Sequence, residues 1–282
     1  MATPSVFKSG NTAVITGGAS GIGLSLANKC MAAGMKVLVA DWDDELLGQI
    51  DASMISTFKM DVGKHDEWEG LKSKVENEFG GKINLLALNA GVSRPTSFLD
   101  PSPTNLTDFN NILSTNLFGV INGIHTLLPL IIKSKLSQSA IIITGSKQGI
   151  TNPPGNPAYN ASKAAIKSLA EHLDYDLRSS PNITVHLLIP GWTFTGLSGN
   201  RPGTEKEKPA GAWWPDQVVD YLSQKMAENK FYIVCPDNDV TTEIDNKRML
   251  WATGDIVVGR PPLTRWRPEF KDDVQSWMDQ DL

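Results

Sequence analysis

Short apolar runs rich in β-branched residues recur along the chain and narrowly limit how it can fold. Almost every position in these runs is apolar, and longer helix-compatible segments separate them. The seven runs are TAVIT (12–16), KVLVA (36–40), ISTFKM (55–60), INLLALN (83–89), AIIITG (140–145), ITVHLLIP (183–190) and FYIVC (231–235). Strands without polar alternation are covered on both faces, as in a parallel sheet flanked by helices. The pattern therefore predicts an α/β fold with a doubly wound, seven-stranded parallel sheet and helices on both faces.

We expect a single domain over residues 1–282, because no repeat or low-complexity tract divides the chain. Its core would span about 8–236. Residues 192–214 are rich in Gly, Pro and charge without clear periodicity, which predicts a loop insertion beside a substrate site, followed by a helix over 215–229. Residues of about 237–282 would form a C-terminal extension.

Two helices are expected in this extension, near 241–253 and 269–278, with a Pro-rich stretch between them. Six of the eight tryptophans in the chain lie after residue 190. Aromatic side chains line ligand pockets and are also enriched at subunit contacts. The late tryptophans are therefore expected to build either the wall of a substrate pocket or a contact between subunits.

Composition argues against several classes of function. A net charge of −5 and the lack of a long Lys/Arg run disfavour binding to nucleic acid or to an anionic membrane. No leader with a charged and then an apolar region begins the sequence, and no apolar run approaches membrane-spanning length, so a cytoplasmic location is expected. Cys30 and Cys235 stand far apart, as thiols do in a reducing compartment. The four histidines lack ligand spacing, so no metal site is expected.

A glycine-rich segment joins the first apolar run to a helical run. Gly17, Gly21 and Gly23 would let the backbone turn tightly, approach a pyrophosphate and pack the helix against the sheet. N–H groups and the positive dipole end at the start of that helix favour phosphate. Because the segment lies between a strand and a helix, it predicts a dinucleotide-binding site.

Asp41 ends the second apolar run. A carboxylate there can accept hydrogen bonds from the ribose hydroxyls of NAD, and it would repel the 2′-phosphate of NADP. Neither Gly18 nor Trp42 offers a basic side chain that would offset this repulsion. The sequence therefore predicts NAD over NADP. The alternative is that Asp41 caps a short helix in the following segment, DDELLGQ.

Tyr159 and Lys163 stand four residues apart in NPAYNASKAAIK. Pro157 would start a helix there, and the amphipathic run that follows would hold both side chains on one face. A phenol with a pKa of about 10 is a poor base at neutral pH, and a nearby cation favours the phenolate. The pair can therefore act as an acid-base device, although this spacing also arises by chance.

These motifs resemble those of the short-chain dehydrogenase/reductase family, whose members have a Rossmann-like fold. The three-glycine spacing after Thr16 and the Tyr159-x-x-x-Lys163 motif match the family pattern. Ser146 lies thirteen residues before Tyr159, the interval of the family's catalytic serine, and Asn116 lies in a matching segment, STNLFGV. The resemblance covers residues of about 11–197. One departure is Leu88, where the family usually has the first Asn of Asn-Asn-Ala-Gly.

The resemblance implies three sets of site residues. The catalytic set is Asn116, Ser146, Tyr159 and Lys163. The cofactor-binding set is Gly17, Ser20, Gly21, Ile22, Gly23, Asp41, Trp42, Asp61, Val62, Asn89, Gly91, Tyr159, Lys163, Pro190, Gly191, Thr193 and Thr195. The substrate set is Arg94, Gln148, Trp192, Phe194, Trp213 and Trp214.

The implied reaction is the NAD(H)-dependent interconversion of a secondary alcohol and a ketone, with Tyr159 as the general acid/base. Lys163 would bind the nicotinamide ribose, Ser146 would hydrogen-bond the substrate oxygen, and Asn116 would hold a water that links Lys163 to solvent. An apolar or aromatic small-molecule substrate and a homodimer or homotetramer are expected. Alternatives are an NADP(H)-dependent ketone reductase, a sugar or polyol dehydrogenase, and a non-catalytic regulator that senses a dinucleotide.

Overall fold

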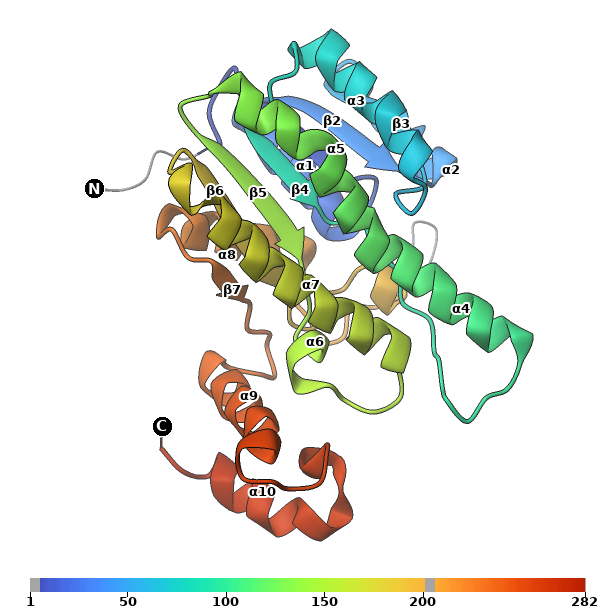
Figure 1. Ribbon diagram of the computed structural model, residues 1–282, viewed down its shortest axis with the longest axis vertical. Helices are drawn as coiled ribbons and strands as arrows, with labels where there is room; N and C mark the ends of the chain where they lie inside the picture. The colour runs from blue at the N-terminus through green and yellow to red at the C-terminus, as the bar shows by residue number, and fades with distance from the viewer. Residues whose placement is uncertain (1–5, 201–205, 282) are drawn as a thin grey trace.

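The seven-stranded parallel sheet is confirmed in the computed structural model, which describes residues 6–200 and 206–281 (Figure 1). The strands are β1 (Thr12–Thr16), β2 (Lys36–Asp41), β3 (Ile55–Lys59), β4 (Leu85–Leu88), β5 (Ser139–Thr144), β6 (Ile183–Ile189) and β7 (Tyr232–Val234). Their order is β3-β2-β1-β4-β5-β6-β7, and all neighbours are parallel. The winding direction reverses between β1 and β4, the place where doubly wound sheets bind ligands.

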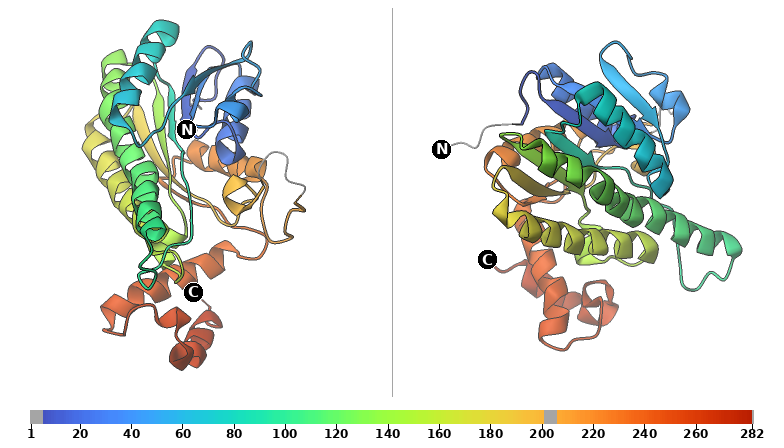
Figure 2. Two further views of the ribbon diagram at one scale, coloured as in Figure 1. Left: turned by 90° about the vertical axis from the view of Figure 1, so that its right-hand side faces the viewer. Right: turned by 45° about the horizontal axis from the view of Figure 1, so that its top comes forward.

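Helices cover both faces of the sheet (Figure 2, left). One face carries α1 (Gly21–Ala32) and α8 (Pro215–Ala227), and the other carries α3 (His65–Phe79), α5 (Gly119–Ser134) and α7 (Pro157–Asp176). Successive strand residues point to opposite faces, so Val14 joins the core under α3, α5 and α7, whereas Ala13 and Ile15 join the core under α1 and α8. Burial on both faces explains why the strands lack polar alternation.

A long helical stretch crosses the α3 face. It consists of α4 (Pro103–Leu113), a π-helical segment (Ser114–Phe118) and α5. Among the described residues this stretch is the one helix long and apolar enough to cross a membrane by length and composition, which corrects the expectation that none is. Val120, Leu127 and Ile131 of α5 lie in the core, and core helices pass the same test, so the stretch is weak evidence for a membrane segment.

The two ends of the predicted insertion pair with each other. Phe194 N donates to Trp213 O at 2.8 Å, and Trp213 N donates to Trp192 O at 2.8 Å. A 3-10 turn, Gly196–Ser198, follows the first of these segments. The predicted helix after the insertion is α8, which Pro215 begins. The insertion is therefore anchored at its base next to the end of β6.

The C-terminal extension contains α9 (Thr242–Val257) and α10 (Lys271–Met278), and α9 continues four residues beyond the predicted end at residue 253. The rings of Trp251 and Trp277 lie 6.1 Å apart between these helices. Trp251 Nε1 donates to Thr264 Oγ1 at 2.9 Å, and Trp277 Nε1 donates to Lys247 O at 3.0 Å. These two tryptophans build the extension's own small core, and the expected role of the late tryptophans in a substrate pocket or a subunit contact stays a prediction.

Short helices complete the fold. They are α2 (Asp44–Leu47), after β2, and α6 (Gln148–Thr151), after β5. α6 packs against α7 on one side and against α9 on the other, so it joins the sheet domain to the extension, as Figure 1 also shows.

Candidate active site

The site predicted from the sequence lies where the strands end. Asp41 ends β2, Asn89 follows β4, and Ser146 comes two residues after β5. Tyr159 lies in the first turn of α7, which begins at Pro157, with Asn156 as the cap. Because carboxyl ends of parallel strands meet at one edge of a sheet, the fold gathers these residues at that edge.

The side chains of Tyr159 and Ser146 lie next to each other and interact. Burial raises the pKa of the Tyr159 phenol, and the interaction with Ser146 opposes this rise. Ser146 Oγ also accepts a hydrogen bond from Gln148 N at 3.2 Å, so the first turn of α6 orients the hydroxyl. The phenol therefore keeps its proton at neutral pH.

Lys163 lies one turn after Tyr159 and is only 4% exposed. Its Nζ donates to Thr144 O at 2.8 Å and lies 5.8 Å from the centroid of the Tyr159 ring. Burial lowers the pKa of Lys163 to about 8. The Tyr–Lys spacing predicts a lowered Tyr159 pKa, but burial raises this pKa, and the opposing influence comes from Ser146.

Asn116 is fully buried in the π-helical segment. Its Oδ1 accepts from Val92 N at 2.8 Å, and its Nδ2 donates to Val92 O at 3.0 Å and to Ser162 Oγ at 3.1 Å. Ser162 Oγ in turn donates to Tyr159 O at 2.7 Å. The side-chain amide thus ties the loop after β4 to the first turn of α7, and the water expected at Asn116 stays a prediction. A π-helical segment of this kind often marks a functional site.

The glycine-rich turn has the geometry of a phosphate cradle. A Cβ on Gly23 would lie 2.1 Å from Gly17 O, so only glycine fits at that crossing. The side chain of Ser20 does not cap α1, and a helix N-terminus offers N–H groups to an anion. Asn89 Nδ2 donates to Thr16 O at 3.3 Å and to Gly17 O at 3.2 Å, which braces the turn from β4. Ile22, the remaining residue predicted here, lies in the first turn of α1.

Asp41 is buried beside the same turn, with an exposed fraction of 7%. Its Oδ2 accepts from Ala19 N at 3.0 Å, and its Oδ1 accepts from Asp43 N at 3.2 Å. Burial raises the pKa of this carboxyl. The cap of α2 is Asp43, whose carboxylate accepts from Leu46 N at 3.1 Å, so the alternative role of Asp41 as the cap is wrong. Each carboxylate oxygen retains capacity for a further hydrogen bond.

The other residues of the cofactor-binding set surround this centre. Trp42 is 69% exposed next to Asp41. Asp61 is exposed beyond β3 and accepts from Gly63 N at 2.9 Å, whereas Val62 is buried in the core. A Cβ on Gly91 would lie 3.6 Å from Lys163 Nζ, so the loop after β4 reaches this lysine.

The segment after β6 also approaches the glycine-rich turn. Pro190 and Gly191 follow the strand, and Thr193 Oγ1 donates to Gly191 O at 3.1 Å. The methyl group of Thr195 lies 3.1 Å from the position that a Cβ on Gly21 would take. Residues of both segments therefore flank the same space at the carboxyl edge.

The residues of the predicted substrate set differ in exposure. Trp192 and Trp214 are each 46% exposed, whereas Phe194 is 3% exposed and stacks edge-on against Trp214 at 5.6 Å. Trp213 packs against Tyr221 of α8 at 5.9 Å and contributes to the core under that helix. Of the tryptophans in this set, only Trp192 and Trp214 offer an exposed aromatic surface.

The remaining two members of the substrate set are exposed polar residues. Arg94 Nε lies 3.6 Å from Asp108 Oδ1, so its charge is already paired on α4. Gln148 is exposed at the start of α6, directly after the Ser146 turn. Their roles toward a substrate stay predictions.

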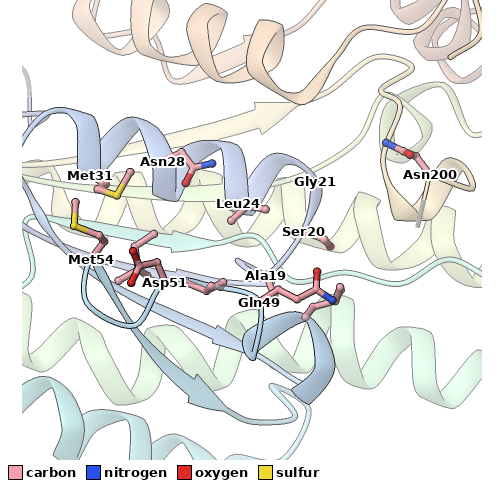
Figure 3. A pocket seen from close by; sticks show the side chains of 13 residues that line it. Ala19, Ser20, Gly21, Leu24, Asn28, Met31, Gln49, Asp51, Met54 and Asn200 are labelled. Carbon is pink, nitrogen blue, oxygen red and sulfur yellow. The ribbon is translucent and has the colours of Figure 1, made fainter. Parts of the chain in front are cut away.

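A cavity of about 610 Å³ adjoins the glycine-rich turn (Figure 3). It lies between α1 and the segment that runs from α2 to β3, and Asn200 borders it. The residues that line it are Ala19, Ser20, Gly21, Leu24, Asn28, Met31, Leu46, Gln49, Ile50, Asp51, Met54, Ile55 and Asn200. Its lining includes residues of the glycine-rich turn but none of Ser146, Tyr159 and Lys163.

Three residues that the sequence patterns did not single out also hold the site. Thr144 accepts the Lys163 hydrogen bond through its carbonyl, and its Oγ1 donates to Asn89 Oδ1 at 3.1 Å. Ser162 links Asn116 to α7, and a Cβ on Gly149 would lie 2.5 Å from the Lys163 carbonyl carbon. All three lie within three residues of a predicted catalytic residue, and that proximity was the available signal.

Comparison with known proteins agrees with this geometry. A family model described as short chain dehydrogenase matches residues 11–206. A "CLA biosynthesis dehydrogenase/reductase" of Lactiplantibacillus plantarum is 30% identical over 250 residues, which cover 78% of this chain and 86% of the relative. An NADP-dependent (R)-specific alcohol dehydrogenase of Lentilactobacillus kefiri is 31% identical over 209 residues, which cover 70% of this chain and 79% of the relative.

A solved structure is similar over nearly the whole chain. The crystal structure of a short-chain dehydrogenase/reductase from Burkholderia phymatum in complex with NAD has a TM-score of 0.78 and 27% identity, covering 90% of this chain and 96% of that chain. The family match includes the glycine-rich turn and the first turn of α7 but ends before α9 and α10.

Proposed function

The chain belongs to the short-chain dehydrogenase family, and from that premise we propose that it is an NAD(H)-dependent oxidoreductase that interconverts a secondary alcohol and a ketone. The observation that carries the proposal is the interaction of the Ser146 hydroxyl with the half-buried phenol of Tyr159, with Lys163 Nζ 5.8 Å from the centroid of the phenol ring. Two hydroxyl groups and a cation at one strand edge are suited to proton transfer at a substrate oxygen.

The residues at the carboxyl edge fit a nicotinamide dinucleotide. The N-terminus of α1 presents N–H groups beside a turn that only glycine can form at Gly23, which suits a pyrophosphate. Asp41 offers a carboxylate for ribose hydroxyls one strand away. When bound, the dinucleotide supplies or accepts the hydride.

Tyr159 would perform the proton transfer. Because burial raises its pKa, the phenol is protonated at neutral pH and can give its proton to the carbonyl oxygen of a ketone. Ser146 would donate a hydrogen bond to the same oxygen as negative charge develops there. Lys163, held by Thr144 O, would stabilise the phenolate that remains, because a nearby cation favours the charged form. In the direction of alcohol oxidation the same phenolate takes the proton back.

The preference for NAD(H) is supported by Asp41 and by the lack of a basic side chain at Gly18 or Trp42. Relatives do not decide the point, because one is described as NADP-dependent and another was crystallised with NAD. Asp41→Asn keeps an acceptor for Ala19 N but removes the charge that would repel a 2′-phosphate. We expect the NADPH affinity of this variant to rise at least about tenfold relative to its NADH affinity, measured by calorimetry. Asp43→Ala serves as the control, and an unchanged ratio for Asp41→Asn would remove the basis of the preference.

The exposed faces of Trp192 and Trp214 support an apolar or aromatic substrate. The proposal includes a single domain, a homodimer or homotetramer, and a cytoplasmic location. Light scattering coupled to gel filtration would measure the subunit number directly.

The decisive test of function uses Tyr159→Phe. Turnover should fall at least about a hundredfold, the low end of general acid-base contributions, while NADH affinity stays within about twofold. Tyr175→Phe, on the same helix but 63% exposed, is the matched control and should keep full turnover. The assay follows NADH absorbance with a panel of aryl ketones, steroids, sugars and polyols.

Two outcomes would count against the proposal. If Tyr159→Phe retained most of the parent turnover, Tyr159 could not be the acid. If the parent bound NADH but reduced no ketone and oxidised no alcohol in the panel, a non-catalytic regulator that senses the dinucleotide would replace the enzyme.

A further inference from the structure

Lys147 follows Ser146 directly and shares its turn. The Lys147 carbonyl accepts hydrogen bonds from Ile150 N at 3.0 Å and from Thr151 N at 2.9 Å, and Gly149 N donates to Ser146 O at 3.1 Å. Both residues therefore belong to the hydrogen-bonded turn that opens α6. A contact that fixes the Lys147 side chain therefore also restrains the backbone of Ser146.

The Lys147 ammonium group is buried between two carboxylates. Its Nζ lies 2.5 Å from Asp245 Oδ2 and 3.5 Å from Asp237 Oδ2, and the side chains of these residues are 16%, 4% and 6% exposed. Within residues 6–200 and 206–281, neither Lys147 Nζ nor Asp245 Oδ2 has an aligned hydrogen bond. Each of these two charges therefore depends on the ion pair, and a buried charge without its partner is costly.

Asp237 extends this contact to the segment after β6. Its Oδ2 accepts from Trp192 N at 3.0 Å, and its Oδ1 accepts from Val240 N at 2.8 Å. A Cβ on Gly191 would lie 2.7 Å from Asp237 Oδ2 and 2.9 Å from Lys147 Nζ. The glycine at the end of β6 thus leaves the space in which the two charged groups meet.

Asp245 connects the Lys147 side chain to the C-terminal extension. It lies in the first turn of α9, which packs against α6. Arg248 and Arg265 are the further charged groups that act on Asp245 from within the extension. Three segments distant in sequence therefore meet at Lys147: the Ser146 turn, the strand end at Gly191 and Trp192, and the extension that lies outside the family match.

We infer that Lys147 is a positioning residue that uses the C-terminal extension, through Asp237 and Asp245, to fix the Ser146 turn against the segment at Gly191 and Trp192. This inference rests on the proposed function, in which these two segments flank the reacting centre. The extension is then part of the active-site support: it holds the Ser146 hydroxyl at its place beside Tyr159. In this role Lys147 acts through its ion pairs with Asp237 and Asp245 and through the backbone of the Ser146 turn.

The test compares Lys147→Met with Lys147→Arg and with Arg260→Met. Arg260 Nε pairs with Asp255 Oδ1 at 2.9 Å inside the extension, so its loss destabilises the extension without altering the Lys147 contacts. At saturating NADH, we expect Lys147→Met to lower kcat at least about tenfold with a change of less than about threefold in the KM for the ketone, because small displacements of catalytic groups are costly. Lys147→Arg should restore kcat to within about threefold of the parent value. Arg260→Met should leave kcat within about twofold of the parent value, even where its Tm falls as far as the Tm of Lys147→Met. If Lys147→Met unfolds, Asp245→Asn replaces it, with the same direction of effect.

Binding of NADH separates this inference from the proposed function. Calorimetry needs no substrate, and Lys147→Met should weaken NADH binding at least about fivefold because the Gly191 segment loses its fixed place. A parent protein that binds NADH without turnover would refute the function and leave this measurement intact. Unchanged NADH affinity and kcat in Lys147→Met, or an equal loss of kcat in Arg260→Met, would overturn the positioning role.

Discussion

The active-site edge and the C-terminal extension both bury charged side chains, but the partners of those charges differ between the two regions. At the site, Lys163 is 4% exposed and bonds to a neutral carbonyl, Thr144 O, and burial lowers its pKa to about 8. In the extension, the Asp255 carboxylate accepts hydrogen bonds from Arg260 Nε at 2.9 Å and from Thr264 N at 3.1 Å. A buried cation without a counter-ion can lose its charge near neutral pH, whereas a paired charge keeps its place. The site is thus suited to proton chemistry and the extension to rigidity.

The largest expected effect comes from removing the site cation with Lys163→Met. The ordinary pKa of Lys163 is 10.5 and the folded value is about 8, so unfolding takes up a proton between these values. The cost of burying the charge is fully present below about pH 8 and is relieved as the pH rises toward 10.5. The free energy of unfolding of the parent should therefore rise by about 2.5 kcal/mol relative to the variant between pH 7 and pH 10.

Urea unfolding at a series of pH values measures this difference. Lys167→Met, four residues along α7, is the control, because the Lys167 ammonium is 39% exposed and pairs with Glu171 at the surface. A gap between parent and Lys163→Met that stays constant from pH 7 to pH 10 would abolish the contrast between site and extension.

A smaller effect is expected from breaking the paired charge in the extension with Arg260→Met. This change removes the bond to Asp255, a second bond to Trp251 O at 3.0 Å, and the stacking of the guanidinium on the Trp251 ring at 3.8 Å. Charge-assisted hydrogen bonds at partly buried positions predict a loss of about 2 kcal/mol in the free energy of unfolding.

The control for this change is Arg178→Met. Arg178 also stacks on an aromatic ring, at 4.1 Å from Tyr175, but at an exposed position. Its loss should cost less than about 0.5 kcal/mol. If chemical denaturation gave equal costs for both variants, the extension would owe its rigidity to something other than paired charge.

The smallest effect is expected from Asp43→Ala, close to the glycine-rich turn. Asp43 caps α2 by accepting from Leu46 N at 3.1 Å, and loss of a cap costs about 1 kcal/mol. Asp44→Ala, which removes only a surface ion pair to Lys59, should cost less than about 0.5 kcal/mol. If thermal unfolding showed a larger loss of stability for Asp44→Ala than for Asp43→Ala, Asp43 would not be the residue that caps α2.

Local pattern made the sheet and much of the site predictable. Seven apolar runs became seven strands because burial on both faces forces nearly continuous apolar sequence. Ser146, Tyr159 and Lys163 could be expected near one another because strand ends and the first turn of a helix meet at one edge. The Asp41 carboxylate and the glycine turn follow from the same rule, and their contact through Ala19 N bears out their proximity.

Contacts between distant segments were not predictable from local pattern. The pairing of Trp251 with Trp277 and of Lys147 with Asp245 joins residues whose neighbours show no periodicity that requires the contact. The direction of the Tyr159 pKa was also missed, because the spacing of Tyr and Lys reveals a nearby cation but not the depth of burial. Burial is a property of the packed fold, and it decides which electrostatic effect is larger.

The central claim is that Lys163 is buried in the site with no carboxylate partner among residues 6–200 and 206–281, so that its charge changes close to neutral pH. The most direct measurement is an NMR titration of lysine side chains labelled with ¹³C at Cε, with Lys163→Met used to assign the resonance. The structure predicts a pKa of about 8 for Lys163. A Lys163 resonance that titrated at the ordinary value of 10.5 would contradict the account.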